Sequence, residues 1–344
     1  MQSIAVIISK GPSNNPVKRK IEADVAAWVA ADPRFELVVA PNLYDLKAEG
    51  EGVSKLKAFD GDMIILTWMY SRAAHWMLNR AGIAGQEGQS LLTYGDDEDQ
   101  EEPNSEEDEK PRVIDELALP QRRIYCIDLR ASQNPEEFLT EVQRIGEECH
   151  ADGSDLVSWL AGKPTQESMK RFLNPENDTA VGAVAPANQI TEDTGRRWYP
   201  VIDFSRCTNC MECIDFCLFG VYGVNGQETI LVEQPDNCRK GCPACSRVCP
   251  ENAIIFPQHK TPAIAGAAVA VDGLKIDLSR LFGAPESKED AVDVAARERD
   301  EQLLLAGREA VGKSVGIPKR QEGKESAAKD DLDDLLDELD DSDL

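Results

Sequence analysis

The sequence predicts an α/β domain built on a parallel sheet, followed by a small cysteine-rich α+β domain. Two observations carry this prediction. In the first 150 residues, short apolar runs alternate with segments of helical periodicity, which is the pattern of strands and crossover helices in a parallel sheet. Farther along, eight of the ten cysteines lie between Cys207 and Cys249, at spacings typical of metal ligands.

Four apolar runs predict strands in the domain assigned to residues 1–150. They are residues 4–8, 35–40, 63–68 and 123–129. Helices are expected between and after them, at residues 15–31, 53–59, 71–81 and 135–148. Asn15 and Pro16 suit the N-cap and the first position of the first of these helices. The alternation is similar to that of flavodoxin-like and Rossmann-like domains, so helices are expected on both faces of the sheet.

Two acidic tracts stand outside these regular elements. The insertion 95–111 lies between the third and fourth strands, and ten of its residues are acidic. Residues 330–343 carry nine acidic residues, with leucines at helical spacing at positions 332, 335, 336 and 339. Such segments bury little apolar surface, so a disordered insertion and a disordered tail are expected. Residues 151–195 are assigned to a helical segment and linker, and 259–344 to an extended or helical segment, with a helix at 287–306, and the tail.

Composition limits the function classes. The hydrophobic content of 42% is enough for buried cores, and the formal charge of −26 argues against nucleic acid and anionic membranes as partners. A basic protein surface remains a plausible partner for the acidic tail. The N-terminus lacks the features of a signal peptide, and no apolar stretch is long enough to span a bilayer. We therefore expect a cytoplasmic protein that is not an integral membrane protein.

The cysteines form two motifs. CTNCMECIDFC supplies Cys207, Cys210, Cys213 and Cys217, and CRKGCPACSRVCP supplies Cys238, Cys242, Cys245 and Cys249. This density suits an iron-sulfur cubane, because three cysteines on one tight loop can reach three iron corners. The alternative is a four-thiolate zinc site made by Cys207, Cys210, Cys242 and Cys245. It leaves four equally well-spaced thiolates unused, so iron-sulfur clusters are favoured.

Residues 196–258 resemble the bacterial-type two-cluster ferredoxins, whose repeated motif binds two 4Fe-4S clusters. In that family the fourth ligand of each cluster comes from the other repeat. The resemblance therefore implies that one cluster takes Cys207, Cys210, Cys213 and Cys249, and the other takes Cys238, Cys242, Cys245 and Cys217. Two departures stand out: Leu218 replaces the usual proline after Cys217, and three residues rather than two separate Cys238 from Cys242. Gly241 would help this longer loop to close.

The sequence around the cysteines predicts a ferredoxin-like βαββαβ order. Strands are expected at 200–204, 221–224, 229–233 and 253–257, and helices at 211–219 and 243–248. Asn225 and Gly226 suit the turn between the two middle strands. Five aromatic residues are expected to pack around the clusters and exclude water, namely Phe204, Phe216, Phe219, Tyr222 and Phe256.

Weaker signals lie in the first domain. Gly11, Ser13 and Asn14 precede a helix N-terminus, where backbone donors can hold a phosphate, as in a flavin or nucleotide site. The loop lacks the hydroxyl-rich pattern of a flavin phosphate site, and its residues are also ordinary turn residues, so a flavin is the less favoured cofactor.

A second weak candidate is the segment after the third strand, which contains Trp68, Tyr70, Arg72, His75 and Trp76. Ligands bind at the carboxyl ends of parallel strands, but aromatic residues at helical spacing are more often part of a core. Of the remaining cysteines, Cys126 lies in a strand run and is expected to be buried, whereas Cys149 and His150 form a weak metal-binding pair without further ligands.

The leading hypothesis is an electron-transfer protein that relays single electrons through two 4Fe-4S clusters to or from a partner oxidoreductase. No catalytic residues are assigned. The alternatives are an oxidoreductase whose α/β domain binds a flavin or small substrate, and an interaction scaffold with structural clusters.

Overall fold

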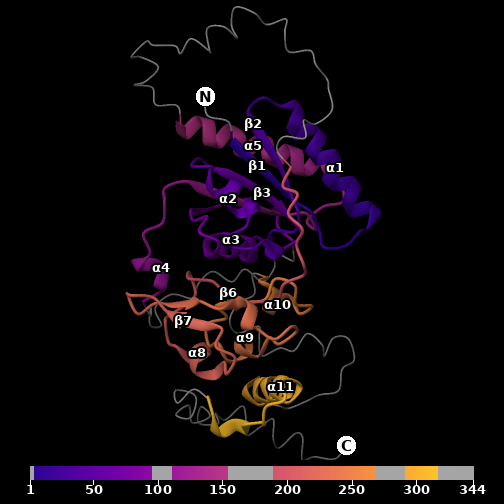
Figure 1. Cartoon of the computed structure of the whole chain (residues 1–344). Coiled ribbons are helices and arrows are strands. Elements are labelled where there is room, and N and C mark those ends of the chain that lie inside the picture. Colours follow the sequence, from indigo (N-terminus) through magenta and orange to yellow (C-terminus); the bar gives the residue numbers. More distant parts are fainter. Residues whose placement is uncertain (1–3, 95–110, 154–188, 268–290, 317–344) are drawn as a thin grey trace, which may run out of the picture.

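The computed structural model describes residues 4–94, 111–153, 189–267 and 291–316 (Figure 1). Its first part is a five-stranded parallel sheet in the order β2-β1-β3-β5-β4. The strands are β1 (Ile4–Ser9), β2 (Phe35–Ala40), β3 (Met63–Thr67), β4 (Gln86–Gly88) and β5 (Arg123–Asp128). The helices between and after them are α1 (Pro16–Ala31), α2 (Glu51–Lys57), α3 (Ser71–Arg80), α4 (Val113–Glu116) and α5 (Pro135–Gly153). The predicted α/β class and parallel sheet are confirmed.

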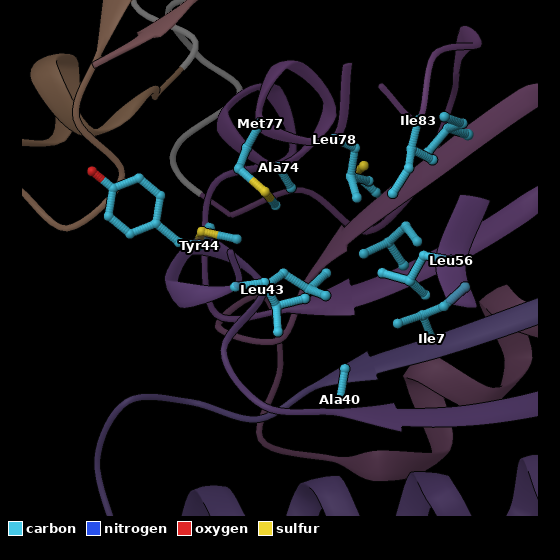
Figure 2. Packing of buried hydrophobic residues seen from close by; sticks show 14 of the residues in the cluster. Ile7, Ala40, Leu43, Tyr44, Leu56, Ala74, Met77, Leu78 and Ile83 are labelled. Atoms are coloured by element: carbon cyan, nitrogen blue, oxygen red, sulfur yellow. The ribbon is translucent and has the colours of Figure 1, made fainter. Parts of the chain in front are cut away.

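Alternating residues of the strands feed two separate cores, which is why helices cover both faces. Val6 and Ile64 point to the face covered by α1 and α5, whereas Ile7 and Ile65 point to the face covered by α2 and α3. Figure 2 shows the second of these cores, with Tyr44 at its margin and its hydroxyl directed away from the aliphatic side chains.

The sequence did not predict β4, a three-residue edge strand paired with β5. Its residues Gln86, Glu87 and Gly88 have neither apolar alternation nor β-branched side chains, which are the usual strand signals. The glycine at position 88 lets the backbone of β4 lie close to the ring of Tyr125 in β5. A Cβ atom at this position would stand only 2.4 Å from that ring. The strand therefore depends on a tertiary contact.

The helix α1 begins as predicted. The side chain of Asn15 accepts a hydrogen bond from the N–H of Val17, and Pro16 occupies the first helical position.

The end of the expected linker packs against the sheet. Gln189 forms a parallel bridge with Val39, and the N–H of Ile190 donates to the carbonyl of Val39 at 2.9 Å. Ile190 is buried, and the carboxylate of Glu192 accepts from the N–H of Gly52 at 3.1 Å. Ile190, an apolar residue in a polar segment, therefore attaches the chain to the edge of the sheet just before the cysteine-rich part. Residues 154–188 of the expected helical segment and linker, residues 95–110 of the acidic insertion, and the acidic tail lie outside the described residues.

The cysteine-rich part has the predicted βαββαβ order. It contains β6 (Val201–Ile202), α8 (Glu212–Phe216), β7 (Tyr222–Val224), β8 (Ile230–Val232), α9 (Ala244–Val248) and β9 (Ile254–Ile255), with a 3-10 turn η5 (Pro235–Asn237) before α9. The strands form two antiparallel pairs, β6 with β9 and β7 with β8. All six elements are shorter than predicted. The helix α8 ends at Phe216 rather than at residue 219, because Cys217 adopts an extended backbone conformation, whereas α9 ends at Val248 as predicted.

Two further elements follow β9. They are α10 (Pro262–Ala265) and α11 (Ala291–Leu305), which is followed by the 3-10 turn η8 (Gly312–Ser314). Figure 1 shows α11 below the cysteine-rich part, on the side opposite the parallel sheet. Arg247 of α9 pairs with Glu298 of α11 at 2.9 Å, so α11 is tied to the cysteine-rich part.

The parallel-sheet part and the cysteine-rich part share a core. Tyr199, Val201 and Ile255 belong to the same buried cluster as α3. Tyr44 stacks on Tyr199 with ring centroids 4.2 Å apart, and the rings of Trp76 and Phe204 meet edge to face at 5.7 Å. The two parts therefore pack directly against each other.

Among the described residues, no helix has the length and apolar character that crossing a membrane requires.

Candidate metal centre

Two cavities in the cysteine-rich part are each lined by four cysteines. The first cavity is lined by Cys207, Cys210, Cys213 and Cys249. The second cavity is lined by Cys217, Cys238, Cys242 and Cys245. Each set takes three cysteines from one motif and the fourth from the other motif. The structure thus brings together the two crossed sets that the ferredoxin resemblance implies, while their role as ligands stays a prediction.

The first loop has a backbone that few residue types tolerate. Asn209 and Met211 adopt left-handed conformations, with φ of 56° and 65°. Asparagine visits this region more readily than most residues, and its side chain stabilises the loop. The amide of Asn209 donates to the carbonyl of Glu228 at 2.9 Å and its oxygen accepts from the N–H of Ile230 at 2.9 Å. The hairpin β7–β8 thereby fixes the loop that carries Cys207 and Cys210.

The second loop closes through a glycine. Gly241 has a φ of 88°, a conformation that is strained for residues with a side chain. It lies inside the longer Cys238–Cys242 spacing and lets the loop turn before Cys242. Cys238 follows the 3-10 turn η5, and Cys245 lies in the first turn of α9. The extra residue therefore does not remove Cys238 from the second cavity.

The crossing arises at the C-terminal ends of the two helices. Cys217 ends α8 with an extended ψ of 107°, and Cys249 ends α9 with an extended ψ of 115°. Cys213 and Cys217 are four residues apart, yet Cys213 lines the first cavity and Cys217 the second. Cys245 and Cys249 divide in the same way, with Cys245 at the second cavity and Cys249 at the first. Leu218 in place of proline does not prevent this exit.

Hydrogen bonds reach the sulfur atoms from the protein. The hydroxyl of Tyr222 donates to Sγ of Cys245 at 3.1 Å. The N–H of Asn209 lies 3.4 Å from Sγ of Cys207, and the N–H of Ala253 lies 3.3 Å from Sγ of Cys249. Donors of this kind stabilise negative charge on sulfur.

Burial dominates the electrostatics of the thiols. Desolvation raises the pKa of Cys242 and of Cys249 to about 11, and it raises the pKa of Cys213 well above its ordinary value. Neighbouring thiolates raise the pKa further, as Cys249 and Cys207 do for Cys213. Four buried thiolates around one cavity are stable only beside compensating positive charge, which a metal centre supplies. The donor set therefore fits an iron-sulfur cluster.

No disulfide is formed by the cysteines in the described part of the chain. Within the same residues, no three His, Cys, Asp or Glu side chains converge as the ligands of a single metal ion.

The aromatic residues predicted to surround the clusters divide into two groups. Phe216, Phe219 and Tyr222 line the second cavity. Phe204 instead packs on Trp76, and Phe256 stacks on Trp198 with ring centroids 5.2 Å apart.

Sequence reasoning missed two residues beside the second cavity. The indole N–H of Trp198 donates to the carbonyl of Cys242 at 3.1 Å, and the buried Arg299 of α11 lines the cavity itself. Trp198 could have been found from the sequence, because it is a lone tryptophan just before the first cysteine motif. Arg299 could not, because it lies far along the chain in a helix with many other charged residues.

The loop at Gly11, Ser13 and Asn14 already contains a carboxylate. Buried Glu22 accepts from the N–H of Gly11 and from the indole N–H of Trp68, both at 2.8 Å. Arg19 pairs with Glu22 and donates to the carbonyls of Gly11 and Ser13. The Gly11 donor that would hold a flavin phosphate is therefore occupied by the protein's own anion.

The other weak candidates have structural contacts. Arg72 pairs with Asp203 and donates to the carbonyl of Asn252, so it joins the two parts of the protein. His75 is buried, and burial lowers its pKa to about 4. Cys126 is buried in β5, and Cys149 is buried near the hydroxyl of Tyr125.

Two relatives from Methanocaldococcus jannaschii match part of the chain. An uncharacterized ferredoxin is 52% identical over 67 residues, which are 19% of this chain and 44% of the relative. The pyruvate synthase subunit PorD is 35% identical over 71 residues, which are 20% of this chain and 80% of that subunit. The match thus spans less than half of the first relative and most of the second. No family model and no solved structure matches the chain.

Proposed function

The chain belongs to the ferredoxin family through its cysteine-rich domain, and we propose that it relays single electrons through two 4Fe-4S clusters. The observation that carries the proposal is the lining of each of two cavities by four cysteines. In the proposed ligation, one cluster is held by the first cavity and the other by the second. When bound, such clusters accept and return one electron at a time, at potentials set by their surroundings.

The protein's own residues have three roles in this proposal. The cysteines hold the two clusters close together, because each repeat contributes to both cavities. Phe216 and Tyr222 exclude water from the second cavity, and the hydroxyl of Tyr222 bonds to a ligand sulfur. Burial and hydrogen bonds to sulfur are two of the factors that adjust the potential of a cluster.

The parallel-sheet domain is proposed to position the cluster domain against a partner oxidoreductase. The proposed division of the chain is 1–150, 151–195, 196–258 and 259–344. The name of PorD, a pyruvate synthase subunit, supports a partner that is itself an oxidoreductase with several subunits. Because the Gly11 donor is occupied by Glu22, the geometry favours an electron carrier over a flavin enzyme.

Anaerobic purification followed by iron, sulfide and flavin analysis tests this function. We expect about eight iron and about eight sulfide ions per chain, as two cubanes require, and no flavin. Reversible one-electron reduction followed by EPR should then show two clusters that cycle. Stoichiometric flavin would favour the enzyme alternative, clusters that do not cycle would favour the scaffold, and zinc without sulfide would refute all three.

A further inference from the structure

Arg299 is a buried cation at the second cavity. Its side chain is 1% exposed, and it lines the cavity together with Cys217, Cys242 and the other two cysteines of that set. The guanidinium carbon lies 4.6 Å from the ring centroid of Phe216. An arginine remains protonated in proteins, so a full positive charge faces the thiols.

The partners of Arg299 are mostly uncharged. Its two terminal nitrogens donate to the carbonyls of Val315 at 2.7 Å and Gly312 at 2.6 Å. Only Nε approaches a carboxylate, that of Asp300, at 3.2 Å. The carbonyls hold the guanidinium in place without neutralising it.

The first cavity has a different lining. Two carboxyl side chains, those of Glu212 and Glu251, stand beside its four cysteines. Arg112 pairs with Glu251 at 3.0 Å, and the side chain of Arg112 is 35% exposed. The two cavities therefore differ in the charge that the protein places next to them.

We propose that Arg299 raises the reduction potential of the cluster in the second cavity above that of the cluster in the first, so that a single electron on the chain resides at the second cavity. This inference rests on the proposed function. A reduced cluster carries one more negative charge than an oxidised one, and a nearby buried cation stabilises that charge strongly because screening by water is weak. Net charge is a recognised determinant of cluster potential.

An EPR-monitored redox titration of the full chain tests the proposal. The wild type should show two one-electron transitions. Arg299→Gln should lower the upper potential and leave the lower one nearly unchanged, whereas Arg299→Lys should retain most of the separation. A tenfold change in the distribution of one electron between the clusters corresponds to about 59 mV, which is the least shift expected for Arg299→Gln.

Arg247→Gln is the matched control. Arg247 ties α9 to α11 through Glu298 but does not line the second cavity. Its loss therefore weakens the docking of α11 without removing the buried charge, and the upper potential should stay within a third of the Arg299→Gln shift. Equal shifts in the two variants, or no shift in Arg299→Gln, would overturn the role of Arg299. Absence of two titrating clusters in the wild type would instead refute the proposed function.

An open groove lies where the second cavity approaches the surface. Cys238 lines both the cavity and the groove, which also exposes Leu305. Three cationic side chains line it, namely Arg239, Lys240 and Arg308, and none of them has an ion-pair partner among the described residues. The one acidic lining residue, Asp236, already pairs with Arg197 at 2.7 Å.

We infer that this groove is the docking surface for an acidic face of the redox partner. The chain as a whole carries a charge of −26, so a cationic groove is a local exception. At physiological ionic strength, screening acts over about 8 Å, so the local charge of the groove decides which surface docks there. An electron at the second cavity would leave through the edge at Cys238.

Small oxidants of opposite charge test this surface on the reduced full chain. One electron passes to cobalt(III), which becomes cobalt(II), and the probes are the anionic cobalt(III)–EDTA complex and the cationic hexaamminecobalt(III). The triple variant Arg239→Gln, Lys240→Gln, Arg308→Gln should slow oxidation by the anion at least tenfold and speed oxidation by the cation. Lys20→Gln, Lys55→Gln, Lys57→Gln changes the net charge equally on the sheet domain and should have little effect.

Equal slowing in the two triple variants would overturn the groove as the exit. So would an unchanged rate with the anion. If neither oxidant accepts electrons from the reduced wild type, the proposed electron-transfer function itself fails.

Discussion

The guanidinium of Arg72 pairs with the carboxylate of Asp203 across 131 residues of sequence. Arg72 lies in the first turn of α3, and Asp203 directly follows β6. The Asp203 side chain is 1% exposed and the Arg72 side chain is 11% exposed, so both charges are removed from water. The ion pair therefore couples the parallel-sheet domain to the domain that carries the cysteines.

Arg72→Ala should destabilise the protein by about 3 kcal/mol or more, because it leaves the Asp203 carboxylate buried without its main partner. Urea unfolding followed by tryptophan fluorescence measures the change. Arg34→Ala is the control, since Arg34 pairs with Asp32 at a site where the side chains are 36% and 22% exposed, and its loss should cost less than about 1 kcal/mol. Similar losses in the two variants would show that the buried pair does not couple the domains.

Cys213→Ser and Cys249→Ser should damage the same cluster, because both cysteines line the first cavity. Cys217→Ser should damage the other cluster, although Cys217 lies in the same motif as Cys213. EPR of the reduced variants and iron analysis distinguish the two losses. Cys126→Ser, a buried thiol in β5 away from both cavities, should leave both signals intact. Loss of one signal by Cys213→Ser and of the other by Cys249→Ser would contradict crossed ligation.

The buried His75 should make the protein less stable in mild acid. Burial lowers the folded-state pKa from 6.5 to about 4, against an opposing effect of Asp203. Between these values the unfolded chain binds the proton and the folded chain does not, so stability is full above about pH 6.5 and falls toward pH 4. One pKa unit is about 1.4 kcal/mol, so the wild type should lose about 2 kcal/mol through His75 at pH 5.

His75→Phe removes this contribution. Urea unfolding at pH 7.5 and pH 5 should show a smaller loss for the variant than for the wild type, by about 2 kcal/mol. All other titrating groups are shared by the two proteins, so the difference isolates His75. An equal loss in both would mean that His75 is already solvated in the folded state.

Removal of iron should unfold the cysteine-rich domain before the sheet domain. Each proposed cluster joins both repeats, and metal binding to such small domains is coupled to folding. After chelation, amide hydrogen exchange should become fast at the β6–β9 pair, Val201 with Ile255, while the β1–β3 pair stays protected. The β1–β3 pair is the internal control. Unchanged protection of β6 would contradict the coupling.

Several elements were predictable because their causes are local. The apolar run that forms β2 and the cap of α1 at Asn15 depend on neighbouring residues alone. The cysteine spacing is local in the same way, since three cysteines on one tight loop are a property of that loop. Gly241 also behaved as expected, with a positive φ inside the longer spacing.

Other features have causes far away in the chain. The strand β4 exists because Gly88 lets the backbone pass close to Tyr125. Ile190, in an expected linker, is buried because Val39 at the edge of the sheet offers it a backbone partner. The loop at Gly11 resembled an anion site in sequence, but the anion is Glu22 from the next helix. None of these contacts leaves a periodic pattern in the sequence.

The sequence alone was enough to predict the class of the first domain and to identify the two motifs that contain the eight cysteines. Hydrophobic periodicity and cysteine spacing are properties of neighbouring residues, so they can be recognised without the tertiary structure. The tertiary structure brings Cys217 to the second cavity and Cys249 to the first, in the crossed arrangement that the ferredoxin resemblance implies. It also decided which charge stands beside each cavity. Arg299 lies more than fifty residues beyond Cys245 in the chain, and it reaches the second cavity from α11. Because its side chain is buried, its charge is only weakly screened by water.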